Sequence, residues 1–336
     1  MEEALKSISR PVRLLAAGGT IAMTGERAVP ALDAAQLLDA LPALAAVPDL
    51  SAENVLSLPG PQISLAQALE LARRACAAAD AGAGVVITTG TDTLEELAVL
   101  CSMLYGGEAP IVLTGANRPA SSPGADGPAN LLDAVALAGS GAAGGIGVVV
   151  AFGGEIHCAM TVRKVDSTGP VAFGSPGAGP IGRIVEGRIW LHAMPLRAPP
   201  LQPQTLERRV AIVTAALGDD GALLEAAAVA GDGVVVVAFG AGHLPPGMLR
   251  ALQAPATRVP VLVTCRPDRS QMLFSTYGFE GAERDLRGAG AICVPFLSAA
   301  AARMALLCCL GAGLSLEGMA AALAQWDARL PFHGRP

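Results

Sequence analysis

One stretch, residues 85–96, constrains the fold of this chain more than any other. It begins with a β-branched apolar run, which is typical of a parallel strand that is buried on both faces. Gly90 ends that strand, and Asp92 followed by Glu95, or Thr93 followed by Glu96, has the spacing of a capping box at the start of a helix. A strand, a turn and a helix in this order predict one βα unit of an open α/β sheet.

Thr91 and Asp92 lie in the turn between this strand and this helix. Open α/β sheets bind their ligands at the carboxyl ends of the strands, so both side chains stand where a binding site is expected. The alternative is that they only cap the helix, because strand–helix junctions commonly use such residues. The local pattern leaves both interpretations open.

The same alternation of strand and helix recurs along most of the chain. It predicts a mostly parallel sheet with flanking helices, followed by a second and smaller α/β unit, with an edge strand at 188–192. The other predicted strands are 12–17, 54–58, 85–89, 111–114, 147–152, 210–214, 234–239 and 259–264. The predicted helices include one that begins after Asp33, one at 65–80 capped by Ser64, and one that Asp126 starts and that runs to Ala138.

A proline-rich stretch interrupts this rhythm and is the best candidate for a linker. With 336 residues the chain is long enough for two domains. We expect an N-terminal α/β domain at 1–196, a linker at 197–207 and a C-terminal α/β domain at 208–336.

Composition and charge exclude several classes of protein. Apolar residues make up 52% of the chain and charged residues 15%, so the chain is globular. A net charge of −6 without a basic block argues against nucleic acid as a partner. No apolar run reaches the roughly 18 residues that a membrane span needs, and the first residues lack the apolar core of a signal peptide. We therefore expect a cytoplasmic protein with no membrane partner.

Cysteine and histidine usage agrees with this expectation. The seven cysteines are scattered and contain no C-x-x-C pair, which is typical of reduced thiols in a cytoplasmic protein. The four histidines are too dispersed for a zinc site, so we expect no metal.

Other familiar catalytic motifs are lacking. Residues 139–144 have the glycine spacing of a dinucleotide fingerprint, but they follow a predicted helix and precede a strand, which is the wrong order. The sequence holds no Walker A pattern and no G-x-S-x-G elbow, so neither nucleotide hydrolysis nor the common serine-hydrolase arrangement is supported.

The remaining candidates for chemistry are Thr20, Thr91, Asp92 and Lys164, which come from three separate segments. A threonine hydroxyl is a poor nucleophile unless a base takes its proton. A lysine whose pKa is lowered could be that base, and a nearby carboxylate could orient it. The alternative is that Lys164 is an ordinary surface lysine paired with Asp166.

Two motifs around the candidate threonines resemble the paired signatures of the bacterial-type L-asparaginase family: 16–22 (AAGGTIA) and 89–96 (TGTDTLEE). Five shorter motifs fit the same family in order, so the resemblance extends over essentially the whole chain. They are 114–119 (TGANRP), 125–131 (ADGPANL), 162–165 (VRKV), 179–182 (GPIG) and 277–279 (YGF).

The resemblance implies a fold, an activity and an assembly. The fold would be the two-domain α/β fold of that family. The activity would be hydrolysis of the side-chain amide of L-asparagine to L-aspartate and ammonia, without a metal or an organic cofactor. The active sites would lie between two subunits of a homodimer, or of a homotetramer built from such dimers.

The resemblance also implies roles for individual residues. Thr20 matches the family's primary nucleophile, and the second threonine, the lysine and the aspartate match Thr91, Lys164 and Asp92. Asp92 would also bind the α-ammonium group of the substrate, and backbone N–H groups near Gly19 and Thr91 would hold the oxyanion. The implied substrate-binding residues are Gly19, Gly60, Gln62, Gly90, Thr91, Asp92 and Glu283. Glu283 would reach in from the neighbouring subunit, with Glu280 as the alternative.

The sequence departs from the family pattern at two places. The segment between Ile21 and Leu32 has no tyrosine, and Gly60 stands where the family has a serine that binds the substrate carboxylate. These departures leave other functions open. The alternatives are another ω-amide or a lactam as substrate (glutamine or D-asparagine among them), a catalytically weak ligand-binding homologue, and an amide-donor subunit of a transfer-RNA amidotransferase.

Overall fold

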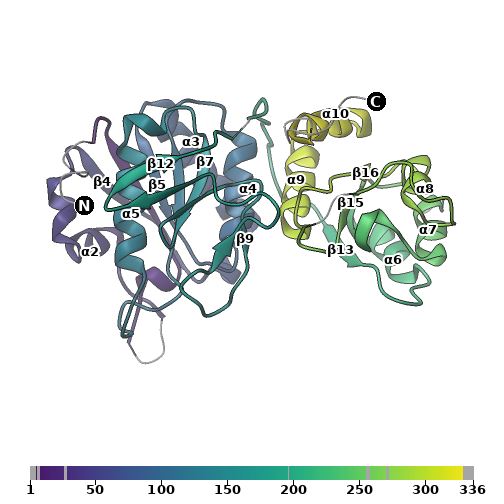
Figure 1. The fold of residues 1–336 in the computed structure, drawn as a ribbon, viewed down its shortest axis with the longest axis horizontal. Coiled ribbons are helices and arrows are strands. Elements are labelled where there is room, and N and C mark those ends of the chain that lie inside the picture. The colour runs from purple at the N-terminus through teal and green to yellow at the C-terminus, as the bar shows by residue number, and fades with distance from the viewer. Residues whose placement is uncertain are drawn as a thin grey trace. The chain divides into compact units, whose positions relative to one another are not determined.

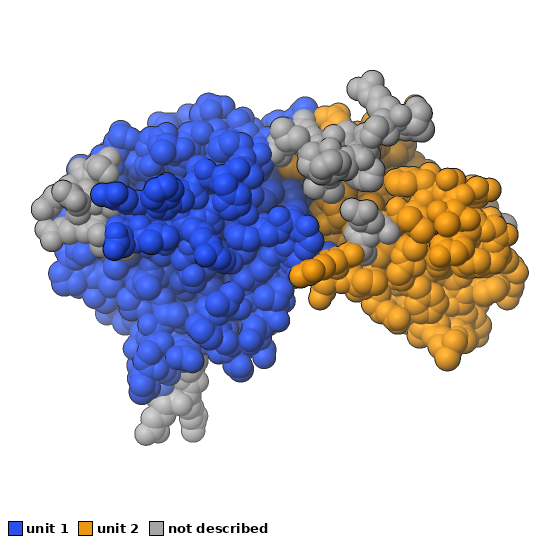
Figure 2. Space-filling view, viewed as in Figure 1, with its two compact units in different colours: residues 1–200 blue, residues 201–336 orange. Residues whose placement is uncertain are grey.

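The computed structural model describes residues 5, 8–25, 29–195, 197–254, 258–269 and 272–327. The chain divides into two compact units, residues 1–200 and residues 201–336 (Figures 1 and 2). The division falls inside the proline-rich stretch of the sequence. Each unit has a hydrophobic core of its own.

The first unit is built on an eight-stranded sheet with the order β12-β11-β8-β7-β6-β5-β1-β4. Strands β4, β1, β5, β6 and β7 are parallel to one another. Beyond β7, the sheet continues with β8, β11 and β12, each antiparallel to the strand before it. The strands are β1 (Val12–Gly18), β4 (Leu50–Leu58), β5 (Gly84–Thr88), β6 (Ile111–Thr114), β7 (Val148–Phe152), β8 (Glu155–Cys158), β11 (Gly182–Val185) and β12 (Arg188–Leu191).

Both edges of this sheet bear on the sequence predictions. The edge strand expected at 188–192 is confirmed as β12. Strand β4 begins at Leu50, four residues before the predicted start at Asn54. It pairs with β1 from Val12 onward, and Leu50 and Ala52 pack against the core while Ser51 and Glu53 are exposed.

Helices cover both faces of the sheet (Figure 1). Helix α5 (Gly127–Gly139) and helix α2 (Ala34–Asp39) pack on the face that carries Leu14, Val86 and Val112. Helix α3 (Leu65–Asp80) and helix α4 (Leu94–Leu104) lie together on the other face.

Two helix starts follow their sequence signals closely. Asp33 caps α2 and Ser64 caps α3, and each forms a complete capping box with the glutamine three residues later. Such a cap contributes about 1 kcal/mol, because it satisfies N–H groups that have no partner within the helix. The predicted bounds of the helix at 65–80 are confirmed.

The second unit repeats the βα pattern on a smaller scale. Its four parallel strands have the order β13-β14-β15-β16: β13 (Val210–Thr214), β14 (Gly233–Ala238), β15 (Val261–Cys265) and β16 (Ile292–Cys293). Its helices are α6 (Ala222–Ala230), α7 (Pro246–Gln253), α8 (Glu283–Gly288), α9 (Ala299–Gly311) and α10 (Leu316–Asp327). Two of these elements, α8 and β16, are too short to leave a periodic signal and were not predicted.

Several short elements connect these layers. Two antiparallel ribbons are made of strands of two residues each. One pairs β2 (Met23–Thr24) with β3 (Val29–Pro30), and the other pairs β9 (Arg163–Lys164) with β10 (Phe173–Gly174). We call residues 163–174 the Lys164 hairpin. Single 3₁₀ turns occur at Thr20–Ala22, Pro42–Ala46, Gly60–Gln62, Gly141–Ala143 and Gly240–Gly242.

The glycine-rich run at 139–144 is the end of α5 and a 3₁₀ turn before β7. This confirms that it is a connection between elements. Within the described ranges, no helix combines the length and the apolar character that a membrane crossing requires.

Candidate active site

A cavity of about 160 Å³ lies beyond the carboxyl ends of the parallel strands in the first unit. Thr20 follows β1, Gly60 follows β4, and Thr91 follows β5, while the Lys164 hairpin supplies a further wall. Parallel strands end at the same edge of their sheet, which is why segments far apart in the sequence meet here. The lining residues are Gly19, Thr20, Met23, Pro59, Gly60, Pro61, Gly90, Thr91, Asp92, Asn117, Lys164 and Ser167.

Three glycines bring these segments into backbone contact. Gly19 has a φ of +79°, and a Cβ on it would collide with the backbone of Gly90. A Cβ on Gly90 would lie 2.8 Å from the backbone nitrogen of Gly60. The turns after β1, β4 and β5 can therefore touch because Gly19 and Gly90 lack side chains, and Thr20 and Thr91 line the same cavity.

Lys164 connects the hairpin to the turn after β5. Its Nζ donates to Thr91 Oγ1 at 2.8 Å and to Asp92 Oδ1 at 2.7 Å. Its backbone N–H donates to Glu95 Oε2 at 2.6 Å, from the first turn of α4. Thr91 is 5% exposed, whereas the Asp92 side chain is 61% exposed. The lysine is thus held at both its backbone and its side chain.

The alternative that Lys164 is a surface lysine paired with Asp166 is wrong. The Asp166 carboxylate instead accepts hydrogen bonds from the backbone N–H groups of Thr168 and Gly169, both at 2.8 Å. These N–H donors hold the pKa of Asp166 below its usual value. Asp166 therefore shapes the tip of the Lys164 hairpin.

Thr20 lines the cavity, and no hydrogen bond joins its hydroxyl to another described residue. The neighbouring Gly19 N–H donates to the Leu58 carbonyl at 3.0 Å. That N–H is therefore not available for an oxyanion. The oxyanion donors expected near Gly19 and near Thr91 therefore stay a prediction, with the Gly19 N–H itself excluded.

The predicted capping box of Thr93 with Glu96 is wrong. Thr93 does precede α4, but its side chain accepts no hydrogen bond from the helix. Its φ of −121° and ψ of 6° lie outside the extended region that a capping side chain needs. Its hydroxyl oxygen instead lies 2.9 Å from the position that a Cβ on Gly60 would take.

Asn117, Ser167 and Glu95 belong to the site or its support and were not among the predicted site residues. Asn117 Nδ2 donates to the Gly169 carbonyl at 2.8 Å, which ties the turn after β6 to the Lys164 hairpin. The signal for Asn117 was its place after a predicted strand, whereas nothing local marks Ser167. Both residues line the cavity only because the hairpin folds over it.

Asp126 supports the same turn. The sequence predicts it at the start of α5, and it does precede that helix, but its side chain makes no capping bond. Its carboxylate accepts instead from the backbone N–H groups of Asn117 and Arg118 at 2.8–3.1 Å.

Two predicted substrate-binding residues do not line this cavity. Gln62 is exposed at the end of its 3₁₀ turn. Glu283 belongs to the second unit, where it is 1% exposed and accepts from the backbone N–H groups of Thr276 and Tyr277 at 2.6 Å and 2.9 Å. His243 Nε2 lies 3.4 Å from its second oxygen.

Burial raises the pKa of the Glu283 carboxyl, but these N–H donors and His243 outweigh it and hold that pKa below its usual value. The alternative residue, Glu280, is exposed and pairs with Arg250 at 3.3 Å.

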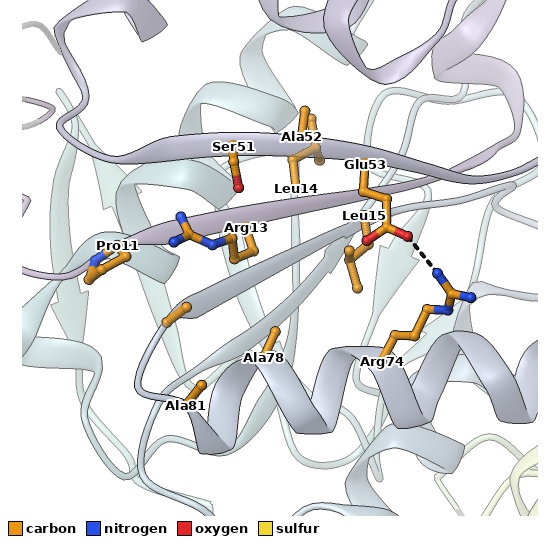
Figure 3. Close-up of a pocket in the computed structure, with 11 residues that line it drawn as sticks. Pro11, Arg13, Leu14, Leu15, Ser51, Ala52, Glu53, Arg74, Ala78 and Ala81 are labelled. Carbon is orange, nitrogen blue, oxygen red and sulfur yellow. Dashed lines mark hydrogen bonds and ion pairs between the residues drawn. The ribbon is translucent and has the colours of Figure 1, made fainter.

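A second cavity of the first unit, about 250 Å³ between β1, β4 and α3, offers no comparable chemistry (Figure 3). Its charged lining residues are Arg13, Glu53 and Arg74. Arg74 pairs with Glu53 at 2.5 Å and Arg13 pairs with Asp49 at 3.0 Å, so these charges are already neutralised within the protein. Across the described ranges, no group of three or more His, Cys, Asp or Glu side chains is arranged to hold a metal ion.

Comparisons with known proteins point in one direction. The model of the N-terminal asparaginase domain matches residues 11–197, and the model of the glutaminase/asparaginase C-terminal domain matches residues 209–323. A probable L-asparaginase of Deinococcus radiodurans is 39% identical over 271 residues, which cover 80% of this chain and 83% of that protein. A glutaminase-asparaginase of Pseudomonas fluorescens biotype A is 35% identical over 195 residues, covering 55% of this chain and 54% of that protein.

A solved structure is similar to this chain over most of its length. The crystal structure of a probable cytoplasmic L-asparaginase from Campylobacter jejuni superposes with a TM-score of 0.81 at 28% identity, covering 94% of this chain and 99% of that one. The expected two-domain α/β fold is confirmed, with a large, mostly parallel sheet and a smaller C-terminal unit. On the two domain matches and the Deinococcus relative, this chain belongs to the bacterial-type asparaginase family.

Proposed function

We propose that this protein is an amidohydrolase that converts L-asparagine to L-aspartate and ammonia with Thr20 as its nucleophile. The observation that carries the proposal is the arrangement of Lys164 Nζ against both Thr91 and Asp92 in the cavity that Thr20 also lines. The relatives named L-asparaginase support the choice of substrate.

In the first half of the reaction, the Thr20 hydroxyl oxygen bonds to the amide carbon, and the bond from that carbon to nitrogen breaks. The proton of the hydroxyl ends on the leaving nitrogen, which departs as ammonia. The hydroxyl needs a polar path for this proton, and the hydrogen-bonded pair of Thr91 and Lys164 supplies one.

In the second half, water adds its oxygen to the acyl carbon, and the bond from that carbon to the Thr20 oxygen breaks. That oxygen takes a proton from the water, and aspartate is released. Thr91 and Lys164 would orient this water. An N–H near Thr91 would stabilise the oxyanion of both steps, a contact worth about 3 kcal/mol in comparable enzymes. No metal or organic cofactor takes part.

Asp92 is the proposed anchor for the α-ammonium group. Lys164 occupies one carboxylate oxygen, and a carboxylate can accept at about four positions, so Asp92 retains capacity for a second cation. With no side chain at Gly60, the α-carboxylate would rely on backbone N–H groups around Gly60 and Gly90. Contacts from Gln62 and Glu283 would require those residues to reach the site in an assembled enzyme.

We further infer a cytoplasmic homodimer or homotetramer with active sites shared between subunits. Support comes from the Campylobacter protein, which is described as cytoplasmic, and from the family resemblance for the shared sites. Light scattering coupled to size-exclusion chromatography tests the assembly, and a monomer with full activity would contradict it.

The direct test is ammonia release from L-asparagine by the wild type and by Thr20→Ala and Thr91→Ala. Both substitutions should lower kcat by at least about a hundredfold, because each removes a hydroxyl from the reaction path. Ser298→Ala is the matched control, since it removes a helix-capping hydroxyl of α9 and costs stability without touching the cavity. A Thr20→Ala variant that keeps wild-type turnover would refute the proposed nucleophile.

A second candidate activity is hydrolysis of glutamine or another ω-amide. Gly60 favours it, because a position without a side chain constrains the substrate less, and a relative is named glutaminase-asparaginase. Measuring kcat/KM for L-asparagine, D-asparagine and L-glutamine separates the two. Thermal stabilisation by aspartate without any turnover would instead indicate a ligand-binding homologue.

A further inference from the structure

A chain of polar side chains joins the base of the Lys164 hairpin to the antiparallel end of the large sheet. Ser175 directly follows β10, and its Oγ lies 3.1 Å from His157 Nδ1 on β8. His157 Nε2 lies 3.5 Å from Glu155 Oε2 on the same strand. Thr161 Oγ1, two residues before β9, donates to Ser175 Oγ at 3.3 Å. Ser175 is 6% exposed and His157 is fully buried.

The chemistry of these groups limits how their protons can be arranged. The Glu155 carboxylate accepts from Arg183 at 2.8 Å through its other oxygen, and an ionised carboxylate has no proton to donate. In the tautomer of His157 that carries its proton on Nε2, toward Glu155, Nδ1 is an acceptor and Ser175 donates to it. The Thr161 hydroxyl lies within hydrogen-bonding distance of both Ser175 Oγ, at 3.3 Å, and the Cys158 carbonyl, at 3.4 Å.

The Lys164 hairpin needs such a support because its own ladder is minimal. Its ladder has two cross-strand pairs, Lys164 opposite Phe173 and Arg163 opposite Gly174, and beyond them two backbone N–H groups donate to the Ala172 carbonyl. A two-stranded ribbon is marginal in water even when it is longer, so its geometry must come from contacts with the rest of the domain. Phe173 supplies an apolar contact by packing against Phe152, with ring centroids 5.0 Å apart.

The polar contacts at the base act on both strands of the hairpin. Ser175 is the residue after Gly174, and Thr161 precedes Arg163 by two positions, so their mutual hydrogen bond closes the open end of the ribbon. Lys164 belongs to the second cross-strand pair beyond that closure, after Arg163 opposite Gly174. A shift of the base therefore moves the Lys164 backbone relative to Thr91, which belongs to a different segment of the sheet.

We propose that Ser175 and His157 are positioning residues that hold Lys164 at hydrogen-bonding distance from Thr91 and Asp92. Neither residue lines the cavity, so both act through the hairpin. The expected effect on turnover rests on the proposed function, whereas the expected effect on the position of Lys164 does not. In comparable sites, a displacement of about 1 Å in a reacting group costs on the order of a hundredfold in rate.

Kinetics provide the first test. Ser175→Ala should lower kcat by about ten- to a hundredfold and change KM less than about threefold, because the lysine is misplaced while the substrate contacts remain. Thr161→Val should act in the same direction, and Thr161→Ser, which keeps the hydroxyl, should retain most of the activity. Thr264→Val is the matched control in the second unit, where the buried hydroxyl donates to the Leu297 carbonyl. It should destabilise the protein without lowering kcat.

A second measurement does not depend on enzyme activity and uses the low lysine content of the chain. Lys6 and Lys164 are its two lysines, so Lys6→Arg leaves Lys164 as the sole lysine. Protein labelled with ¹³C-lysine then gives one ¹³Cε resonance that reports the surroundings of the Lys164 ammonium. In Ser175→Ala and Thr161→Val this resonance should move toward the position of a solvent-exposed lysine, and in Thr264→Val it should not.

The two readouts separate the possible failures. If both variants fold, keep the wild-type kcat and leave the Lys164 resonance unmoved, the positioning role is refuted. If the wild type releases no ammonia from any ω-amide, the proposed function fails, while the resonance still decides whether Ser175 holds Lys164. A resonance that moves equally in the Thr264→Val control would also contradict the proposal, because the effect would then be one of general destabilisation.

Discussion

Lys164 Nζ lies 2.8 Å from Thr91 Oγ1, although the two residues are 73 positions apart in the chain. Thr91 stands on the turn after a central strand, and Lys164 stands on a hairpin that two cross-strand pairs and its outside contacts hold in place. The contact is therefore a product of tertiary structure, and the following predictions test how the surrounding residues maintain and use it.

Removing the lysine amino group should abolish most of the activity. In Lys164→Met the side chain keeps its length and apolar stem, but the buried Thr91 hydroxyl loses its partner. We expect kcat for ammonia release to fall by about 10² to 10⁴, the usual contribution of a positioned proton-transfer group. Steady-state kinetics on protein with an intact melting transition measure this. Turnover within twofold of the wild type would show that Lys164 is a structural contact only.

Gly19→Ala should disrupt the contact between the strand-end turns. The new Cβ would collide with the Gly90 backbone, which cannot move aside as a flexible side chain would. Gly25→Ala is the matched control, because Gly25 has nearly the same φ, +78° against +79°, but no described atom lies within 4 Å of its added Cβ.

Urea unfolding should show a loss of about 1–2 kcal/mol for Gly25→Ala, the cost of a left-handed backbone alone. Gly19→Ala should lose clearly more free energy of unfolding, or fail to fold. Equal losses in the two variants would mean that the glycine contact contributes nothing beyond backbone strain.

Gly60→Ser should improve the use of L-asparagine. The added Cβ would lie 2.9 Å from Thr93 Oγ1, the end of a side chain that can rotate away, so the fold should tolerate it. A serine hydroxyl near the substrate carboxylate would add one charge-assisted hydrogen bond, and about 1 kcal/mol of binding corresponds to roughly a fivefold lower KM. Gly60→Ala separates the hydroxyl from the added volume. If serine and alanine give the same KM, the carboxylate does not bind at this position.

Folding stability should decline as the pH falls below about 6.5, in part because of His157. Burial lowers the pKa of His157, and the nearby Glu155, which raises it, does not fully compensate. The unfolded chain therefore binds a proton at a higher pH than the folded chain, so stability is lost as the pH falls through the unfolded value near 6.5.

Comparing the free energy of unfolding at pH 7.5 and pH 5.5 tests this. His157→Gln should reduce the difference between the two pH values, even though it lowers stability at both. His192→Gln is the control, because it removes a histidine that is exposed. An unchanged difference in His157→Gln would mean that other groups account for the acid sensitivity.

Much of the scaffold was predictable from the sequence. The strand at 111–114 and the helix at 65–80 have the predicted bounds, because each carries a strong local signal, a β-branched run in one case and a capping box in the other. The capping box at Thr93 was wrong because the backbone of Thr93 is not extended, and its hydroxyl lies 2.9 Å from the place of a Cβ on Gly60, 33 positions earlier. Local spacing carries no information about such a neighbour.

The residue types of the candidate site were readable from the sequence, since hydroxyls, a carboxylate and a lysine stood out at strand ends and in a polar stretch. The family resemblance added roles to them. What only the tertiary structure decided is which partner each group takes: Lys164 binds Thr91 and Asp92 and not Asp166, Gly19 donates to Leu58, and Ser167 lines the cavity. The physical reason is that helix periods and turn signals act over a few residues, whereas hydrogen bonds across strand ends depend on sheet order and on Gly19 and Gly90, which let separate turns touch.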